Sequence, residues 1–374
     1  MRRVAPAVGL FFTAPLVAEF LLGNLPITLL VGLVFLAPLY GGGALLVREF
    51  VRRTGRGWPS ILLLGLAYGV FEEGITTQSL FNRNYVGAHL LDVGYVPALG
   101  IAVPWTLAVL ALHTVWSISV PIGLVEAMVP QRRTTPWLGK VGLTVTGVLF
   151  VFGSVATTAM QIARDPFVAS VPQFAGVAVV VVALVVAAFL IRPHRAVTST
   201  ESSVREVGRR APSVWLVGGF ALVCGSAYRL TPDHTAAWVP VVMMAAIAGV
   251  AVTTVTYWSR RPGWEPRHQL ALVAGAALAY ALHAFIETPI LPVSTTVDRA
   301  GDVFFGAAAV LAIAVAARRT RQAPAGVTES VAPTGNASPH RFPTHPQQPA
   351  PPPPTAHRPP PTAHRPPPRN PYLR

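Results

Sequence analysis

Long apolar stretches alternate with short polar ones along almost the whole chain. Most apolar stretches extend over about twenty positions, the length that a helix needs to cross a bilayer. Helices and closed barrels are the two structures that satisfy their backbone hydrogen bonds in lipid, and uninterrupted runs of this length favour helices. The pattern predicts an all-α bundle of ten membrane spans, over residues 1–23, 27–47, 60–80, 98–129, 141–163, 172–191, 213–230, 237–258, 269–291 and 302–317.

Basic residues gather in every second connection between these spans. They cluster at the N-terminus, directly after the last span, and in the loops 48–58, 130–140, 192–212 and 259–268. The opposite set of connections and span ends holds Arg83, Arg164, Arg229 and Arg299. Because cytoplasmic loops carry an excess of Lys and Arg, we expect a multi-pass protein of the bacterial inner (plasma) membrane with both termini in the cytoplasm.

The composition agrees with a protein surrounded by lipid. Of 374 residues, 52% are hydrophobic and 12% are charged, whereas soluble domains average about 25% charged residues. The formal net charge of +14 comes from 29 Lys and Arg against 15 Asp and Glu. The loop bias accounts for this excess, so we expect the lipid bilayer as a partner and no nucleic acid.

The last part of the sequence has a different character. Residues 323–374 are rich in Pro and Arg, and the motif PPPTAHR occurs twice in succession, at 352–358 and 359–365. This composition cannot bury a core and favours an extended chain. We therefore predict a helix bundle over 1–322 and a disordered cytoplasmic tail over 323–374, with the polar connection 192–212 as the best internal boundary. The tail is expected to contact anionic lipid or a partner that binds Pro-rich segments.

The third predicted span carries two adjacent acids, Glu72 and Glu73, well inside its apolar run. Ionisable residues at this depth are costly, so the doublet points to a function. Thr76 and Thr77 follow four positions later and extend the same two helical faces with hydroxyl groups. Two close carboxylates in a medium of low dielectric do not readily ionise together, which separates such a pair into one base and one acid.

Two histidines lie midway along other predicted spans. His113 has Ser117 four positions later and His283 has Glu287 at the same spacing, so each pair shares a helical face. By span direction, both histidines lie at a depth similar to that of the two acids, between the midplane and the outer half of the membrane. The structural alternative is a hydrogen-bonded packing role. Other charged residues near span ends are interpreted as caps or snorkelling side chains without a chemical role: Glu19, Arg48, Glu49 and Glu126.

These residues resemble the motifs of the CPBP family, the CAAX-processing and bacteriocin-processing intramembrane proteases. That family has a Glu-Glu doublet in one span, a His in a later span and His-x-x-x-Asn or Asp in a further span. Glu72-Glu73, His113 and the stretch from His283 to Glu287 are similar to these motifs in that order. The chain differs in Thr77, where the family has Arg, in Val109, where it has Phe, and in Glu287 itself. The stretches GVFEEG and HTVWSISVP are also similar to those of an uncharacterised bacterial multi-spanning family.

The CPBP resemblance implies an intramembrane hydrolase that acts on a peptide or small molecule within the membrane. It implies Glu72 or Glu73 as the general base for water, with His113 assisting it. By the same resemblance, His283 stabilises the developing oxyanion. The implied catalytic residues are therefore Glu72, Glu73, His113 and His283.

Three alternatives stay open. The same acids are suitable protonation sites for a proton-coupled transporter or permease, and the chain is equally compatible with a non-enzymatic membrane protein. A weaker third option is a metal site formed by Glu72, Glu73, His113 and His283. The main hypothesis includes no cofactor and no metal. The single cysteine, Cys224, excludes an intrachain disulfide and a thiolate zinc site, and the sequence lacks Gly-rich phosphate-loop, HExxH and GxSxG motifs.

Overall fold

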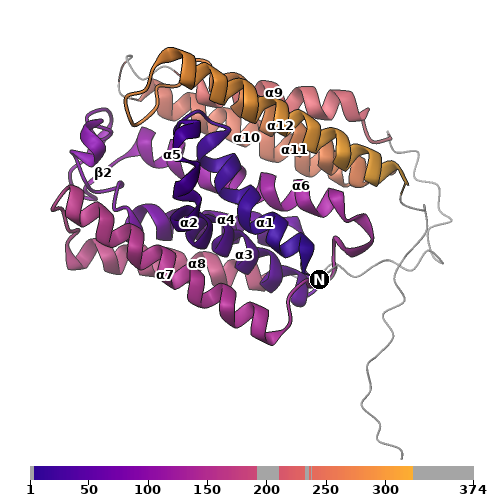
Figure 1. The fold of residues 1–374 in the computed structure, drawn as a ribbon, viewed down its shortest axis with the longest axis horizontal. Helices are drawn as coiled ribbons and strands as arrows, with labels where there is room; N and C mark the ends of the chain where they lie inside the picture. Colours follow the sequence, from indigo (N-terminus) through magenta and orange to yellow (C-terminus); the bar gives the residue numbers. More distant parts are fainter. Residues whose placement is uncertain (1–3, 192–209, 232–235, 237, 323–374) are drawn as a thin grey trace, which may run out of the picture. The chain divides into compact units, whose positions relative to one another are not determined.

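A computed structural model describes residues 4–191, 210–231, 236 and 238–322 of the chain. These residues form a bundle of helices with one two-stranded hairpin (Figure 1). A helical segment occupies each of the ten predicted spans, and the prediction of an all-α membrane bundle is confirmed. The predicted tail 323–374 and most of the predicted boundary 192–212 lie outside the described residues.

The elements follow the predicted spans in order. Up to residue 132 they are α1 (Ala5–Pro15), η1 (Leu16–Phe20), η2 (Ile27–Gly32), α2 (Leu33–Leu36), η3 (Ala37–Gly41), α3 (Gly42–Arg53), α4 (Trp58–Phe71), η4 (Glu72–Thr76), η5 (Tyr85–Gly87), α5 (Val103–Leu112), η6 (His113–Ser119), α6 (Val120–Met128) and η7 (Pro130–Arg132). The remaining helices are α7 (Lys140–Arg164), α8 (Val171–Leu190), α9 (Val214–Arg229), α10 (Val239–Ser259), α11 (Pro266–His283) and α12 (Thr295–Gln322). The hairpin pairs β1 (Tyr95–Val96) with β2 (Ile101–Ala102) in antiparallel register.

Six of these helices are long and apolar enough to cross a membrane: Ile27–Arg53, Val103–Met128, Lys140–Arg164, Val171–Leu190, Val239–Ser259 and Thr295–Gln322. Ala5–Phe20 and Val214–Arg229 are shorter apolar helices.

Two predicted spans differ in extent from the helices. The helix of the fourth span begins at Val103, because residues before it form the hairpin with a left-handed turn at Gly100. The helix of the ninth ends at His283, shortly before Pro289, which disfavours a helical residue ahead of it.

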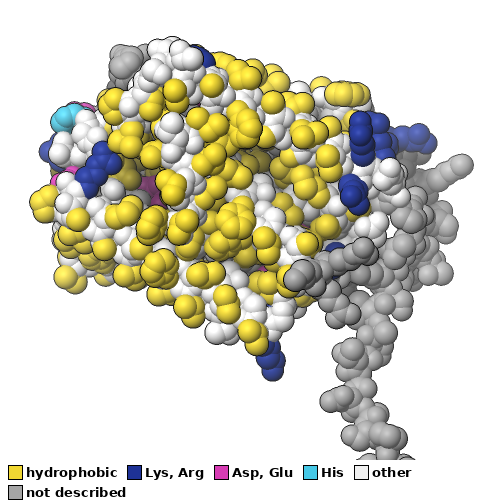
Figure 2. All heavy atoms as spheres, viewed as in Figure 1, with side chains coloured by type: hydrophobic (Ala, Val, Ile, Leu, Met, Phe, Trp, Pro, Cys, Tyr) yellow, Lys and Arg dark blue, Asp and Glu magenta, His cyan; other side chains and the backbone are white. Residues whose placement is uncertain are grey.

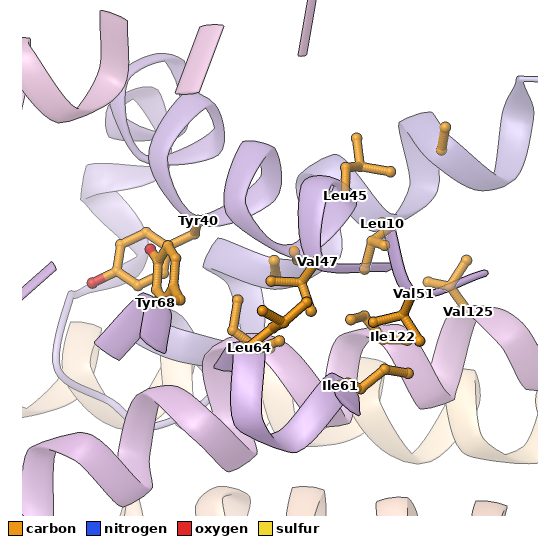
Figure 3. Packing of buried hydrophobic residues seen from close by; sticks show 14 of the residues in the cluster. Leu10, Tyr40, Leu45, Val47, Val51, Ile61, Leu64, Tyr68, Ile122 and Val125 are labelled. Atoms are coloured by element: carbon orange, nitrogen blue, oxygen red, sulfur yellow. The ribbon is translucent and has the colours of Figure 1, made fainter. Parts of the chain in front are cut away.

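The other helices pack around the segments from α1 to α6. On one side α7 packs on η3 and α3, and α8 packs on α4, while a group formed by α9 to α12 lies on the other side (Figure 1). One apolar cluster joins α1, α3, α4 and α6 through side chains such as Leu10, Ile61 and Ile122 (Figure 3). A second cluster joins η1, η6, α11 and α12 around Phe20, Trp116 and Tyr280. The central helices therefore have buried surroundings on several sides.

The outer helices expose apolar side chains instead. In the apolar 18-residue stretch of α7, only 17% is buried inside the bundle, and the corresponding share is 11% in α8 and in α10. Figure 2 shows hydrophobic side chains over most of the face in view. A surface of this kind is stable in contact with lipid tails, which supports the membrane assignment.

Three of the charged residues interpreted as caps or snorkelling side chains, Arg48, Glu49 and Glu126, form a buried network with Arg52. Arg48 and Glu49 are fully buried on α3, and their side chains lie 2.8 Å apart. Arg52 binds Glu126 of α6 through two hydrogen bonds of 2.8 and 2.6 Å. The Arg48 guanidinium also lies 3.2 Å from the ring centroid of Trp137. These ion pairs join the end of α3 to α6 and to the following loop, so we assign them a structural role.

Close helix packing generates a stability prediction at Gly41. A Cβ atom there would overlap the carbonyl oxygen of Phe11 in α1, whereas a Cβ at Gly147 of α7 would meet no atom within 4 Å. We expect Gly41→Ala to destabilise the bundle by about 1–3 kcal/mol through overpacking. Gly147→Ala is expected to be neutral or slightly stabilising, because Ala favours a helix over Gly. Thermal unfolding of the full chain in detergent measures both, and equal melting temperatures would contradict this packing.

Candidate functional site

Three of the predicted site residues meet inside the bundle. The Nε2 atom of His113 lies 2.6 Å from Glu73 Oε1 and 2.9 Å from Glu72 Oε2. All three side chains are buried, with 1% of Glu72, 6% of Glu73 and 2% of His113 exposed. We call this cluster the Glu–Glu–His triad. Glu72 lies 14 residues after Trp58, where α4 begins, so the triad is about 21 Å along that helix axis.

A local change of helix type places both acids toward one histidine. Successive side chains of an α-helix point about 100° apart, which would separate neighbouring carboxylates. After Phe71, however, α4 continues as the π-helical turn η4, in which the Thr77 amide donates to the Glu72 carbonyl oxygen at 2.8 Å. A π turn holds more residues than an α turn, so neighbouring side chains diverge less. His113 begins another π-helical segment, η6, which packs against α4, and its side chain reaches both acids.

Glu73 is held by several donors. Thr77 Oγ1 donates to Glu73 Oε2 at 3.0 Å, and Ser79 Oγ donates to the same oxygen. Trp105 Nε1 in turn donates to Ser79 Oγ at 3.1 Å. With His113 on its other oxygen, Glu73 is a carboxylate whose position is fixed on both sides.

His113 is held in an equally defined orientation. Its Nδ1 atom lies 3.1 Å from Ser117 Oγ, the partner expected from the i, i+4 spacing. The Tyr40 ring stacks on the imidazole at 6.0 Å and the Tyr68 ring approaches it edge-on at 5.8 Å. The two tyrosines lie next to one another in Figure 3. The aromatic rings and Ser117 therefore fix which ring nitrogen faces the carboxylates.

Glu72 differs from its neighbour because it lacks a donor. A ring nitrogen carries at most one hydrogen, and His113 Nε2 is closer to Glu73 than to Glu72. Among the described residues, Glu72 Oε2 accordingly has no hydrogen-bond partner. The Oγ1 atom of Thr76 and the hydroxyl of Tyr68 are also buried without one. The triad thus contains a carboxylate oxygen that no donor among the described residues satisfies.

Sequence reasoning missed a third acid close to the triad, Glu19. Glu19 in η1 accepts from the Tyr40 hydroxyl and from Asn24 Nδ2, each at 2.5 Å. Its place near the end of the first predicted span suggested a cap, whereas its hydrogen bond with Tyr40 links it to the ring that stacks on His113, that of Tyr40 itself. The signal was present in the sequence as an acid within an apolar run, but Tyr40 comes from a later helix.

An apolar groove lies beside the turn that carries the acids. It has a volume of about 420 Å³ and is lined by Phe71, Ile75 and Thr76 and by residues of α7 between 150 and 162. Thr76 lies four positions after Glu72, on the same helical side. Because α7 exposes most of its surface, the groove opens toward the space that lipid occupies.

The structure does not bring His283 into the triad. Its Nε2 atom lies 3.1 Å from Glu287 Oε2, and Arg229 NH2 lies 3.0 Å from that same oxygen. Among the described residues, Glu287 is therefore the ion partner of His283, and Arg229 NH2 also lies 3.3 Å from His283 Nε2. The helices are nevertheless neighbours, because Trp116 of η6 stacks on Tyr280 of α11 with 4.3 Å between ring centroids. The predicted His–Glu pair at i, i+4 therefore exists, but as a separate cluster with its own cation.

Comparison with known proteins assigns the chain to a family. A model of an uncharacterized membrane protein family matches residues 10–299. The chain belongs to this family. The matched region includes the triad, Glu19 and the His283–Glu287 pair. No curated protein and no solved structure matches the chain, so the resemblance to CPBP proteases rests on the motif residues alone.

The unequal surroundings of the two acids generate a paired prediction. Glu72→Gln removes a buried charge that lacks a donor, so we expect it to raise the stability of the metal-free protein by about 1–3 kcal/mol. Glu73→Gln replaces the carboxylate that accepts hydrogen bonds from Thr77 and Ser79 by a neutral amide. These hydrogen bonds become weaker, so we expect the free energy of unfolding to fall by a similar amount. The two substitutions are isosteric, so each controls for the other. Melting temperatures in detergent with a chelator measure both, and shifts of the same sign would contradict the assigned roles.

Proposed function

We propose that the protein is an intramembrane hydrolase whose reacting centre is the Glu–Glu–His triad. The observation that supports this most directly is the contact of one histidine with two carboxylates inside a buried, hydrogen-bonded frame. Paired carboxylates in unequal environments are typical of acid–base catalysis, because the environment gives each a different task. Clusters of ionisable residues within membrane spans are also functional by default.

Glu72 is the proposed general base. Because its Oε2 atom has no hydrogen-bond donor among the described residues, the Glu72 carboxylate is free to accept a proton from a water molecule through either of its oxygens. The resulting hydroxide bonds to the carbonyl carbon of the substrate, and the bond from that carbon to the leaving nitrogen or oxygen then breaks. The proton on Glu72 passes to the leaving atom, which restores the carboxylate. Glu73 orients His113, whose Nε2 lies beside both acids, so that the imidazole assists Glu72 in the proton transfer.

The surroundings of the triad favour a substrate that resides in the membrane. The groove beside η4 is apolar and opens between η4 and the exposed surface of α7. A peptide segment or small molecule dissolved in lipid would reach this groove without crossing water. Thr76 lines the groove and belongs to the turn that carries both acids, so it joins the groove to the proposed reacting centre.

A second candidate function is proton-coupled transport. The observation that favours it is the association of proline with three π-helical segments: Pro15 precedes η1, Pro38 lies in η3, and Pro121 follows η6. Such irregular segments act as hinges in membrane transporters. In that function Glu72 would bind and release a proton during transport instead of activating water.

Hydrolysis is tested by the new chain termini that the protein creates. Membranes from cells producing the full chain are labelled at free N-termini and analysed by mass spectrometry. We expect termini within membrane segments of other proteins that Glu72→Gln and Glu73→Gln reduce by about 10²–10⁴-fold, the typical contribution of acid–base catalysis. Glu287→Gln is the matched control, because this acid also contacts a histidine but lies outside the triad.

The outcomes separate the candidates. Termini that persist in both triad variants would exclude a proteolytic role for these acids. If no termini depend on the protein, proton uptake by vesicles containing it tests transport, and loss of uptake in Glu72→Gln would favour the permease.

We further propose that both termini face the cytoplasm of a bacterial cell, on the basis of the Lys and Arg bias. In a Cys224→Ala background, Ala88→Cys and Thr134→Cys place single thiols on exposed positions of two loops. An impermeant maleimide should label Ala88→Cys in intact spheroplasts and Thr134→Cys only after permeabilisation. The reverse pattern would invert the orientation.

A further inference from the structure

We infer that the Glu–Glu–His triad binds one divalent transition-metal ion, and that Zn²⁺ suits its ligands best. The inference concerns the same residues as the proposed hydrolase and names the ion that this site would use. It is carried by the charge balance, the ligand geometry and the second layer of hydrogen bonds around the triad.

The charge balance of the triad differs from that of the other buried acids. Glu126 pairs with Arg48 and Arg52, and Glu49 pairs with Arg48 and Arg53. For Glu72 and Glu73, the ion partner among the described residues is His113 alone. Even a protonated imidazole leaves one negative charge unbalanced in a low-dielectric interior, which is costly. A divalent cation with a neutral His113 balances both carboxylates.

The ligand atoms already surround a common point. One nitrogen of His113 and one oxygen of each acid lie within 4.8 Å of one another, and all three residues are buried. Zinc binds such atoms at about 2.0–2.2 Å, and tetrahedral ligands at that distance are about 3.4 Å apart. The present contacts of 2.6 and 2.9 Å between His113 and the acids would lengthen by less than about 1 Å on binding. Three protein ligands leave a fourth position open, as in catalytic zinc sites.

The surrounding hydrogen bonds orient these ligands for a metal. Ser117 Oγ lies 3.1 Å from His113 Nδ1. When Nδ1 donates its hydrogen to that oxygen, the lone pair of Nε2 faces the carboxylates. Two carboxylates around an imidazole lone pair repel it unless a cation lies between them. Thr77 and Ser79 likewise bind the outer oxygen of Glu73 and leave Oε1 directed at the centre. Hydroxyl and backbone partners of this kind fix the first ligands in most metal sites.

An independent observation points to a missing ligand. Glu72 Oε2 is buried and lacks a hydrogen-bond partner among the described residues, although it faces His113. Thr76 and Tyr68 also have buried, unpartnered hydroxyls close to the same turn. Native proteins rarely leave buried polar groups unsatisfied. A metal ion bound between the three side chains would satisfy the Glu72 oxygen directly.

The donor set narrows the choice of ion. One imidazole nitrogen and two carboxylates suit Zn²⁺, Mn²⁺ and Fe²⁺, whereas Ca²⁺ and Mg²⁺ prefer oxygen ligands throughout. The affinity of nitrogen- and oxygen-based sites rises toward Zn²⁺ along this series. We therefore choose Zn²⁺ as the probe, with Co²⁺ as its spectroscopic substitute.

The chain contains a matched comparison. His283 and Glu287 form a second His–Glu contact at 3.1 Å, but Arg229 supplies a positive charge at 3.0 Å from the same carboxylate oxygen. That cluster has its own cation and needs no metal. Substitutions there change a histidine–glutamate contact without touching the triad.

The experiment uses the full chain, purified in detergent without a polyhistidine tag. Four histidines of the C-terminal segment, His340, His345, His357 and His364, are replaced by Gln to exclude binding there. After chelation and dialysis, calorimetric titration with Zn²⁺ and the visible spectrum with Co²⁺ report binding. We expect about one ion per chain and a tetrahedral Co²⁺ spectrum. Binding should vanish in His113→Asn and Glu72→Gln, weaken by about 10–100-fold in Ser117→Ala, and remain unchanged in Glu287→Gln.

Several results would overturn the inference. The first is that the folded protein, shown to be folded by its cooperative unfolding, binds no Zn²⁺. The second is that Zn²⁺ binding persists in His113→Asn, and the third is that Glu287→Gln loses Zn²⁺ binding as fully as the triad variants. If His113→Asn does not fold, Glu72→Gln and Ser117→Ala decide the question, because both retain the imidazole. Hydrolysis that persists after chelation would refute the metal while the hydrolase stands. Stoichiometric Zn²⁺ binding without any hydrolysis would refute the hydrolase while the metal site stands.

Discussion

Two adjacent carboxylates deep in a membrane bundle are the constraint on which the central part of this structure depends. Neither acid can face lipid, and an uncompensated charge in a low-dielectric interior is costly. The protein surrounds Glu73 with donors from its own turn and brings His113 from the next helix against both acids. Tyr40 and Tyr68 enclose the imidazole with aromatic rings. The packing of α1, α3, α4 and η6 around this point follows from the need to exclude lipid from it.

The π-helical segments position the side chains that surround the two carboxylates. Four occur among the described residues, η1, η3, η4 and η6, and each contributes one or more side chains to the site or its immediate surroundings: Glu19, Tyr40, Glu72 with Glu73, and His113. A π turn loses regular i to i+4 hydrogen bonds and persists where it serves a function. Four such turns close to one ion cluster are difficult to explain by packing alone.

The sequence predicted the helices and the triad, and its failures have physical causes. The apolar runs located all ten helical segments because a bilayer fixes the length of a span. Glu72, Glu73 and His113 were identifiable because ionisable residues in apolar runs are rare. The spacing along one helix predicted the contacts of His113 with Ser117 and of His283 with Glu287. It could not reveal which helices are neighbours, so Arg229 was missed as the partner of Glu287, and Glu19 was taken for a cap. The π turns also leave no clear pattern in apolar spacing.

The contrast between the two histidine–glutamate clusters argues that they do different work. In the cluster of His283, an arginine neutralises the single carboxylate, and the group is stable as it stands. In the triad, two carboxylates share one imidazole, so a proton, a metal ion or a reacting molecule must supply the remaining positive charge. A buried site that lacks a balancing positive charge is poorly suited to stabilise the fold as an ion pair between helices. At the end of α3, by contrast, the buried acids pair with arginine, and we assign those ion pairs a structural role. The absence of an arginine partner for Glu72 among the described residues therefore favours a chemical role for the triad over a structural one, and the apolar groove beside η4 is the reason why we propose a substrate within the membrane.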